Sequence, residues 1–534
     1  MFDVTAEDII ERFGKPDVVW ASPPCFTGET LVLTDLGFKE IKDVEVGDRV
    51  ITHTNTYQTV TEIGRKRTNK IRVIKTSASY NINTTDEHPF YVRKNYRKWN
   101  SQKRGWDRII EDPEWIEAKD LEKNWLVGHA INQKSIVPKW EGTKHVLRNQ
   151  FGTETTKIFN TLDKYMSNID FWWLIGRYIG DGWYCYKTFD VGIKNKYLFS
   201  VCCAKDELSE ITSVLDRLGD DFKYRVSEEK ATYNIDITKK EIVEFVMQFG
   251  KYAHGKKINN TIIDLPKDLL KSFLDGYFSA DGFSSVNKAG TITNCATSVS
   301  RELLYGIGQC VMKVYNTPFS LAMYERSKTS VIEGRVINQR DSWTLSYTDN
   351  STKKHSFVED GILWSPVKDI QVKQEDVYVY NMSVENDNTY TANGAIVHNC
   401  TKFSVAAIGK HWIKGTNEPK TPETVEALKL LEHTVQLIKD LDPQFYFIEN
   451  PRGKMRKMDV LQDLPRYTVT YCNYGDFRMK PTDIWTNHPQ PNFKPACKNG
   501  DPCHVAAPRG SQTGTQGIKG AVDGPRIPDK LTDY

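Results

Sequence analysis

A short motif is split between two distant positions of this chain. Pro24 ends the first piece, and Cys400 begins the second. If residues 25–399 are removed, the flanks join to read W-A-S-P-P-C-T-K-F-S. A coherent motif is therefore interrupted by a removable insert, and the chain divides into one insert and two flanks.

The sequence pattern changes along the chain together with this division. Alternating apolar and polar residues around glycine turns predict short β-strands at 30–50 and again at 377–397. Between them, helical spacing of apolar residues occurs at 171–179 and 269–278, separated by strand-like runs. An all-β shell interrupted by an α+β domain is the expected arrangement.

The composition describes a soluble chain of about three or four domains. Of its 534 residues, 39% are hydrophobic and 26% are charged. No apolar run reaches the roughly 18 residues of a membrane span, and the first residues lack a secretory signal, so a cytoplasmic protein without membrane contact is expected. Ten scattered cysteines favour reduced thiols. The formal charge is only +3, so any DNA contact must come from local patches.

The edges of the insert carry a spaced set of residues that resembles an intein, a segment that excises itself and ligates its neighbours. The set consists of an edge cysteine, a Thr-x-x-His block, a strand-like block and a terminal His-Asn-Cys: Cys25, Thr85, His88, 379–385, His398, Asn399 and Cys400. A lone cysteine is usually a small buried hydrophobe. The co-occurrence of these residues in order is what favours splicing, and the resemblance implies the all-β HINT fold.

At the amino edge, the resemblance implies a role for three residues. Cys25 would attack the carbonyl of Pro24 and convert the amide to a thioester. Because a planar amide resists this attack, strain or oxyanion donors must help. His88 would polarise or protonate the amide, and Thr85 would support the oxyanion.

At the carboxyl edge, the resemblance implies the later steps. Cys400 would take the acyl group, Asn399 would cyclise to cut its own peptide bond, and His398 would assist that cyclisation. A sulfur-to-nitrogen shift would then leave an ordinary peptide bond. Asn381 and Asn388 stand where the family commonly has an aspartate and a histidine, so slower or rerouted proton transfer is expected.

Two stretches of the insert repeat each other. LIGRYIGDG and LDGYFSADG occur 100 residues apart and resemble the paired helices of a LAGLIDADG homing endonuclease. Gly176 and Gly276 would let the helices approach closely, and Asp181 and Asp281 would lie at their carboxyl ends. A carboxylate there meets the negative end of the helix dipole, which favours a divalent cation between the pair. Mg²⁺ held by both aspartates, with hydrolysis of double-stranded DNA, is the expected chemistry.

Ordinary helix-to-turn junctions are the alternative for these stretches, because Asp-Gly alone is a common turn. Cleavage activity is a separate question from the fold, since such inserts can decay while keeping both acidic residues. The family also places a lysine late in each repeat, near the nucleophilic water. Lys239 or Lys240 in the first repeat and Lys353 or Lys354 in the second are the candidates.

A segment shortly after His88 is dense in cations and aromatic residues, with Asp107 as its only acid. It comprises 93–99, Lys103, Arg104, Trp106 and Arg108. Such a segment can neutralise DNA phosphates and release counterions. A solvated loop is the ordinary explanation for a charge run, and both interpretations stay open.

The flanks, residues 1–24 and 400–534, resemble a cytosine-5 DNA methyltransferase of the bacteriophage type. After splicing, Cys400 would attack cytosine C6, Glu449 in I-E-N-P-R would hold the flipped base, and Arg478 matches a later arginine motif. Pieces of an α/β, Rossmann-like fold are therefore expected. The family's Phe-x-Gly-x-Gly loop for S-adenosylmethionine does not occur upstream of the insert, so the cofactor half would be truncated or encoded elsewhere.

A metal site in the second flank is not favoured by the sequence. Cys472, Cys497, Cys503 and His504 are ligand types, but they lack paired C-x-x-C spacing.

The expected architecture is multidomain. It comprises a host segment, the first HINT part, the LAGLIDADG endonuclease, the second HINT part and a methyltransferase-like host segment: 1–24, 25–140, 141–354, 355–399 and 400–534. The expected function is a monomeric self-splicing precursor with an embedded endonuclease for double-stranded DNA. A methyltransferase fragment with an inactive insert and a nonenzymatic DNA-binding protein are the two competing hypotheses.

Overall fold

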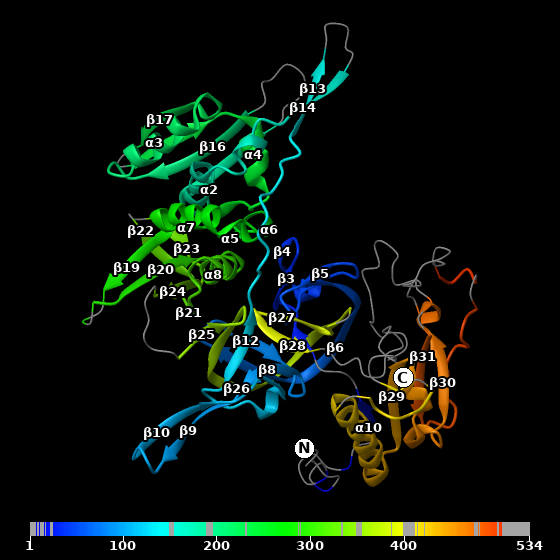
Figure 1. The fold of residues 1–534 in the computed structure, drawn as a ribbon. Coiled ribbons are helices and arrows are strands. Elements are labelled where there is room, and N and C mark those ends of the chain that lie inside the picture. Colours follow the sequence, from blue (N-terminus) through cyan, green and yellow to red (C-terminus); the bar gives the residue numbers. More distant parts are fainter. Residues whose placement is uncertain are drawn as a thin grey trace.

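The computed structural model of the protein describes most of the chain. The described residues are 7, 10, 15, 18–21, 25–148, 154–187, 196–229, 232–286, 288, 290–332, 335–348, 355–385, 387–398, 412–413, 415–420, 422–474, 479, 481–498 and 501–504. Figure 1 shows a large β-sheet body, a unit built around paired helices, and a smaller sheet formed by the flanks. No helix in these ranges combines the length and apolar character that crossing a bilayer requires.

The large sheet has 13 strands and contains both edges of the insert. Its strands are β2 (Phe26–Thr27), β3 (Leu31–Thr34), β4 (Gly37–Glu40), β5 (Arg49–Ile51), β6 (Tyr57–Thr76), β7 (Ile82–Thr84), β8 (Pro89–Arg93), β11 (Glu114–Glu117), β12 (Leu126–Ala130), β25 (Phe357–Glu359), β26 (Ile362–Val384), β27 (Thr389–Ala392) and β28 (Ala395–His398). The long strands β6 and β26 pair antiparallel, with register shifts that bend the ribbon. The predicted β-strands at both ends of the insert are confirmed.

The interior of this sheet follows from the alternation of side chains along each strand. In β8, Phe90 and Val92 are buried, whereas Tyr91 between them is only half-buried. Phe26 of β2 and Tyr390 of β27 join this core from other strands of the sheet, and the Phe26 ring centroid lies 6.1 Å from those of both Phe90 and Tyr390. Burial of each such aromatic side chain contributes about 1.5–3 kcal/mol, so the reactive edges rest on a well-packed core.

The helical unit repeats one topology twice. The first copy comprises α2 (Ile169–Asp181), β15 (Gly182–Lys187), β16 (Lys196–Cys203), α3 (Leu208–Leu218), β17 (Tyr224–Glu229), β18 (Thr232–Ile237) and α4 (Lys240–Met247). The second comprises α7 (Lys267–Asp281), β19 (Gly282–Val286), β20 (Ile292–Ser298), α8 (Arg301–Tyr315), β21 (Phe319–Tyr324) and β24 (Ser342–Tyr347). The sheet orders are β15-β16-β18-β17 and β19-β20-β24-β21. The repeat that the sequence predicts is therefore present in the fold, and both predicted helices are confirmed.

Helices α2 and α7 pack together through glycines. A Cβ atom added at Gly176 would lie 2.0 Å from the Phe273 carbonyl oxygen, and one added at Gly276 would lie 2.0 Å from the Trp173 carbonyl oxygen. Side-chain carbons do not approach backbone this closely. Asn168 caps α2 by accepting hydrogen bonds from the amides of its first turn. The expected close approach of the two helices is confirmed.

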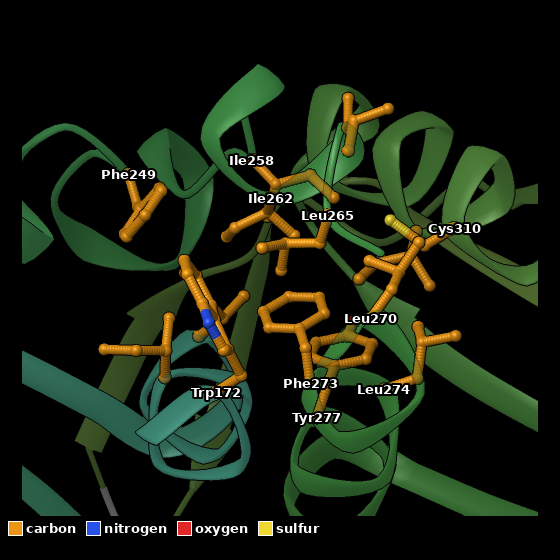
Figure 2. Packing of buried hydrophobic residues seen from close by; sticks show 14 of the residues in the cluster. Trp172, Phe249, Ile258, Ile262, Leu265, Leu270, Phe273, Leu274, Tyr277 and Cys310 are labelled. Atoms are coloured by element: carbon orange, nitrogen blue, oxygen red, sulfur yellow. The ribbon is translucent and has the colours of Figure 1, made fainter. Parts of the chain in front are cut away.

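Both helices bury their apolar faces against the segment that joins the two copies. Figure 2 shows Trp172 of α2 and Phe273 and Tyr277 of α7 pointing toward Ile262 and Leu265. All five side chains are fully buried. Ile262 belongs to the short helix α6 (Asn260–Ile263). The joining segment is thus part of the core.

The helical unit and the large sheet also share buried contacts. The Tyr57 hydroxyl of β6 accepts hydrogen bonds from the side-chain amides of Asn132 and Asn260, both at 3.0 Å. The Gln309 side chain of α8 donates to the Ala130 carbonyl at 2.9 Å. Burial raises the pKa of Tyr57 well above its ordinary value. The helical unit is therefore joined to the large sheet by a continuous core.

The flanks form a sheet ordered β1-β29-β31-β30. Its strands are β1 (Val18–Ala21), β29 (Phe445–Pro451), β31 (Pro481–Thr486) and β30 (Arg466–Thr470). β1 runs parallel to β29, although the whole insert separates them in sequence. α10 (Pro422–Leu441) contributes Val435 and Ile438 to a core with Tyr446 and Ile448. This helix and these strands agree with the expected pieces of an α/β fold, and a complete Rossmann-like fold stays a prediction.

Two β-hairpins project from these bodies (Figure 1). One is formed by β9 (Asn95–Asn100) and β10 (Gly105–Ile110), and the other by β13 (Thr143–Arg148) and β14 (Glu154–Phe159). The basic aromatic segment is thus a hairpin and not the loop of the ordinary explanation. A cross-strand pair stabilises it, because the Trp99 and Trp106 rings meet edge to face at 5.5 Å.

Candidate functional site

Cys25 is held by backbone hydrogen bonds just before β2. It is 2% exposed and packs against Ile71 and Val379. Its amide nitrogen donates to the Thr85 hydroxyl at 3.0 Å, and its carbonyl accepts from the Thr85 amide at 2.9 Å and the Thr84 hydroxyl at 3.2 Å. The Thr85 hydroxyl therefore contacts the nitrogen of the Pro24–Cys25 amide. The predicted support of an oxyanion concerns the Pro24 carbonyl, which lies outside the described residues.

The turn that carries Thr85 and His88 is tied to β6 by ion pairs. Asp86 accepts from Arg72 Nε at 2.8 Å and lies 2.6 Å from Lys70 Nζ. Burial by itself raises the pKa of Asp86, but hydrogen bonds from Lys70 and Arg72 outweigh it and lower the pKa below its ordinary value. Asp86 is therefore a charged anchor for the turn, which sequence reasoning passed over as the interior of the Thr-x-x-His block.

His88 lies in the interior beside the residue that follows Cys25. Its side chain is fully buried, and its ring centroid lies 4.1 Å from that of Phe26. Its amide donates to the Thr85 carbonyl at 3.4 Å, and its carbonyl accepts from the Ala118 amide at 2.9 Å. These two hydrogen bonds fix the backbone of His88, and its imidazole packs beside Phe26, the residue that follows Cys25.

The two edges of the insert meet at this histidine. β8 starts directly after His88 and pairs antiparallel with β28, with Val397 opposite Phe90. Because the strands are antiparallel, the end of β28 at His398 lies beside the start of β8. The end of the insert is thus directed toward His88. Two predicted residues lie outside the described residues: Asn399 and Cys400.

His53, a histidine that sequence reasoning missed, lies near His398 at the end of the insert. His398 pairs across the sheet with Thr389, and its ring centroid lies 5.0 Å from that of Trp115. The Thr389 hydroxyl is 2.9 Å from His53 Nδ1, and the His53 ring lies 6.1 Å from Trp115. His53 follows β5, far away in sequence, so only the sheet pairing brings it here.

The two positions that depart from the family pattern also lie at this site. Asn381 is buried, and its side-chain oxygen accepts from the Tyr390 hydroxyl at 2.8 Å and from the Met382 amide at 2.8 Å. Burial raises the pKa of Tyr390 well above its ordinary value, and Cys25 raises it further. Asn388 is buried too, directly before Thr389, with a left-handed φ of 53°. Uncharged amides therefore stand near both edges.

The acidic pair lies at the carboxyl ends of α2 and α7. Asp181 and Asp281 are the last residues of these helices. Burial raises the pKa of Asp281 to about 6, and the charge of Asp181 adds to this rise. Burial also raises the pKa of Asp181. Two carboxylates that resist ionisation beside each other fit a hard divalent cation, which accepts carboxylate oxygens.

The lysine beside this pair comes from the joining segment. Lys256 Nζ donates to the Tyr178 carbonyl at 3.3 Å and to the Gly180 carbonyl at 2.5 Å. Burial lowers the pKa of Lys256 to about 8, against the opposing influence of Asp281 and Asp181. Its position between the repeats explains why a search late in each repeat does not find it.

The lysines chosen from the sequence are engaged elsewhere or lie outside the described residues. Lys239 is 3.1 Å from Asp221, and Lys240 is 3.3 Å from Glu244. These two candidates are therefore wrong as partners of the acidic pair. The other two lie outside the described residues: Lys353 and Lys354.

An arginine partly compensates the first aspartate. Arg177 is 1% exposed, and its guanidinium lies 3.4 Å from Asp181 and 2.8 Å from Glu207. It also donates to the Ser279 carbonyl of α7 at 2.5 Å. Arg177 therefore links the two helix ends and leaves Asp281 as the less compensated carboxylate.

The β9–β10 hairpin presents a cationic and aromatic surface. Its exposed cationic and aromatic side chains are Tyr96, Arg97, Lys98, Trp99, Lys103, Arg104, Trp106 and Arg108. Arg93 instead turns inward and pairs with Glu359, and Lys94 pairs with Glu114 at 2.7 Å. DNA contact by this hairpin stays a prediction.

In the flanks, Glu449 lies next to the strand that leads to the insert. Ala21 of β1 pairs with Ile448 of β29, and Glu449 is the next residue. Its carboxylate accepts from the Tyr471 hydroxyl at 2.9 Å. Arg478 lies outside the described residues.

Comparisons with solved structures find distant likenesses to homing endonucleases. The homing endonuclease I-DmoI in complex with DNA and Ca is 13% identical with a TM-score of 0.25, covering 35% of this chain and 84% of that one. The LAGLIDADG meganuclease I-AabMI bound to uncleaved DNA is 11% identical with a TM-score of 0.20, covering 33% of this chain and 78% of that one.

Curated relatives match over longer stretches. An ATP-dependent DNA helicase Hel308 of Thermococcus kodakarensis is 26% identical over 74% of this chain and 38% of that protein. A DNA polymerase of Thermococcus sp. (strain GE8) is 24% identical over 77% of this chain and 24% of that protein. The matched part is therefore less than half of each of these two relatives.

A family profile decides the assignment. The profile described as an intein splicing domain matches residues 29–399, well over half of the 534 residues. Its limits include the Thr85 to His88 turn and both long strands of the large sheet. The protein therefore belongs to the intein family and carries an intein splicing domain.

Proposed function

We propose that the chain is a self-splicing precursor that excises residues 25–399 and joins Pro24 to Cys400. One observation carries this proposal. His88 contacts Phe26, beside the first edge, and directly precedes β8, the strand that pairs with β28 close to the second edge. One buried imidazole beside both edges would let cleavage at the first edge be coupled to cleavage at the second.

In the first step, the Cys25 thiol attacks the Pro24 carbonyl carbon. The C–N bond breaks, a C–S bond forms, and the released nitrogen takes a proton. The Thr85 hydroxyl accepts a hydrogen bond from that nitrogen at 3.0 Å and so holds the scissile amide, beside which it would support the oxyanion. His88 would act as the general acid, a role that typically accelerates a reaction about 10²–10⁴-fold.

In the later steps, the Cys400 thiol attacks the thioester and takes over the acyl chain, which frees the Cys25 thiol. The Asn399 side-chain nitrogen then attacks its own carbonyl, forms a succinimide and releases the Cys400 amine. That amine displaces the sulfur and completes the peptide bond. Two histidines lie near the end of the insert: His398 packs against Trp115, and His53 contacts the Thr389 hydroxyl.

The amino-edge mechanism predicts a sharp effect of His88→Ala. Thioester formation, measured as dithiothreitol-induced cleavage after Pro24 in a time course of intact masses, should slow about 100-fold or more. His254→Ala is the matched control, because His254 is exposed in the helical unit. Equal rates in the two variants would remove His88 from the mechanism.

The proposed nuclease is the repeated helical unit, with Asp181 and Asp281 holding Mg²⁺. When bound, the cation would supply the positive charge that polarises the scissile phosphate and activates the attacking water. The two aspartates orient it, and Lys256 stabilises negative charge beside them. Support comes from the duplicated topology, the glycine-packed helices and the raised pKa of Asp281. The substrate would be double-stranded DNA spanning the uninterrupted junction.

The host activity that the flanks support is cytosine-5 DNA methylation after splicing. β1 pairs with β29 and places Ala21 opposite Ile448, the residue before Glu449, and the Tyr471 hydroxyl donates to the Glu449 carboxylate. Cys400 would be the nucleophile in the restored loop, and Arg478 would supply the later arginine motif that the resemblance implies.

Two other functions make different predictions. A methyltransferase fragment with an inactive insert would persist as the full-length chain and would not cut DNA with the empty junction. A nonenzymatic DNA-binding protein would bind that DNA without Mg²⁺-dependent cuts. Freshly made protein incubated with junction DNA therefore separates all three functions.

A further inference from the structure

Three cysteines and one histidine converge in the flank after the insert. Cys472 belongs to a 3-10 turn, η8 (Tyr471–Tyr474), directly after β30. Cys497, Cys503 and His504 come from the segment beyond β31. The ligand atoms of the four side chains all lie within 4.8 Å of one another. The fold thus assembles a cluster that its sequence spacing does not predict.

The distances within the cluster are those of unbonded ligand atoms. Cys472 Sγ lies 3.1 Å from Cys497 Sγ and 3.5 Å from Cys503 Sγ. His504 Nδ1 lies 3.6 Å from Cys497 Sγ and 3.5 Å from Cys503 Sγ. A disulfide would need a separation of about 2.05 Å, and all three cysteines are free.

We propose that these four side chains bind one Zn²⁺ ion in a closed structural site. Tetrahedral zinc, with bonds of about 2.3 Å to sulfur and 2.0–2.1 Å to nitrogen, requires ligand separations of about 3.5–3.8 Å. The two separations from His504 match the sulfur–nitrogen end of this range. The Cys472–Cys497 separation of 3.1 Å would widen by about 0.7 Å to reach the sulfur–sulfur end. Binding converts three thiols to thiolates and releases their protons. Four protein ligands leave no open position, which is typical of structural rather than catalytic zinc.

The ligands are positioned by hydrogen bonds of their own segments. The Cys497 amide donates to the Thr470 hydroxyl at 2.9 Å, and the Asn473 side chain donates to the Pro495 carbonyl at 2.7 Å. The Lys498 amide donates to the Asp501 carboxylate at 2.6 Å, which turns the chain back toward the cluster. These contacts reduce the conformational entropy lost on metal binding.

The site would also orient the host residue Glu449. Tyr471 is adjacent to Cys472, and its hydroxyl donates to the Glu449 carboxylate at 2.9 Å. Zinc at Cys472 therefore fixes η8, and through Tyr471 it restricts the Glu449 side chain. This proposal stands apart from splicing and nuclease activity, since none of the four ligands belongs to the insert.

The test uses the full chain with Cys25→Ala and Asn399→Ala, so that it stays in one piece and lacks the thiol of the splice edge. Zinc content is measured by elemental analysis after purification under reducing conditions, and cobalt substitution is followed by absorption. Cys497→Ser and Cys503→Ser are the test variants. Cys202→Ser, at a half-buried cysteine of the helical unit, is the matched control.

We expect one equivalent of zinc in the parent and in Cys202→Ser, with thiolate-to-cobalt charge-transfer absorption after substitution. Both test variants should lose the zinc and this absorption. Chelation of the parent should make residues 487–504 susceptible to protease while the helical unit stays resistant. A parent with reduced thiols that neither retains nor takes up zinc would overturn the proposal. An intact mass showing loss of two hydrogens, with a Cys472–Cys497 disulfide peptide, would overturn it in favour of a redox pair.

Discussion

The splicing site and the acidic pair both unite residues that are distant in sequence, but they do so in different ways. The splicing site draws single residues from unlike segments through strand pairing, and hydrogen bonds such as that between Cys25 and Thr85 fix it. The acidic pair comes from two copies of one motif, brought together by glycine-packed helices. The splicing site therefore depends on strand register, and the acidic pair depends on the small size of Gly176 and Gly276.

The two sites also differ in charge. Near the splice edges, the buried partners are neutral groups such as Asn381 and Tyr390. At the helix ends, burial and mutual repulsion raise the pKa of Asp281. The difference agrees with the two proposals, in which splicing uses only side chains of the chain and the acidic pair binds a cation. The shared core around Tyr57 nevertheless links their stabilities.

The largest expected effect separates the two chemistries. The combination of Cys25→Ala and Asn399→Ala removes the first nucleophile and the cyclising amide, so splicing should stop completely. A gel of expressed protein should show only the full-length chain. DNA cleavage should persist in this variant, because neither substitution touches α2 or α7. Cys185→Ala, at a half-buried cysteine of the helical unit, should splice like the parent.

The reciprocal change is Asp181→Asn. Loss of one carboxylate should reduce Mg²⁺-dependent cleavage of junction DNA about 100-fold or more, because cation binding and transition-state stabilisation both suffer. Splicing, measured on the same preparation by intact mass, should be unchanged. Cleavage at the parental rate would mean that the pair is an ordinary helix-to-turn junction.

A steric change tests the packing of the helices. Gly176→Ala would put a methyl group where only 2.0 Å separates it from the Phe273 carbonyl oxygen. We expect a loss of more than about 3 kcal/mol in the free energy of unfolding, measured by urea denaturation of the splice-blocked chain. Gly255→Ala is the control, since its added Cβ would meet open space. Similar midpoints for both variants would refute the close approach.

The smallest effect concerns pH. Burial raises the pKa of Asp281 to about 6 in the folded chain, from an ordinary value of 3.8. Between pH 3.8 and about pH 6 the folded chain keeps the Asp281 proton, whereas the unfolded chain has lost it. The free energy of unfolding therefore falls as pH rises through this window. Asp281→Asn should therefore stabilise the chain by about 1–3 kcal/mol at pH 7.5 in the presence of a chelator. The gain should vanish below about pH 4, and equal stabilisation at both pH values would contradict the assigned shift.

Much of this organisation could be predicted from local pattern and repetition. The two repeated helices with their terminal aspartates and the strands near both ends of the insert follow from residue spacing. These are features of one segment or of a duplicated one. The order of the family residues along the chain likewise indicated the splicing domain.

The residues that were not predicted depend on tertiary contacts. His53 reaches the exit of the insert only through β-sheet pairing, and Lys256 lies between the repeats rather than within either one. The cluster around Cys472 combines one residue after β30 with three that lie far along the chain. The buried hydrogen bonds of Tyr57 could not be foreseen, because amides and a phenol have no characteristic spacing.

The most direct test of the central claim is an intact-mass and peptide analysis of freshly made, unmutated protein. The account predicts a ligated product containing a Pro24–Cys400 peptide bond, together with a released fragment of residues 25–399 that ends in a succinimide. Full-length chain alone, with neither the new bond nor the released fragment, would contradict it.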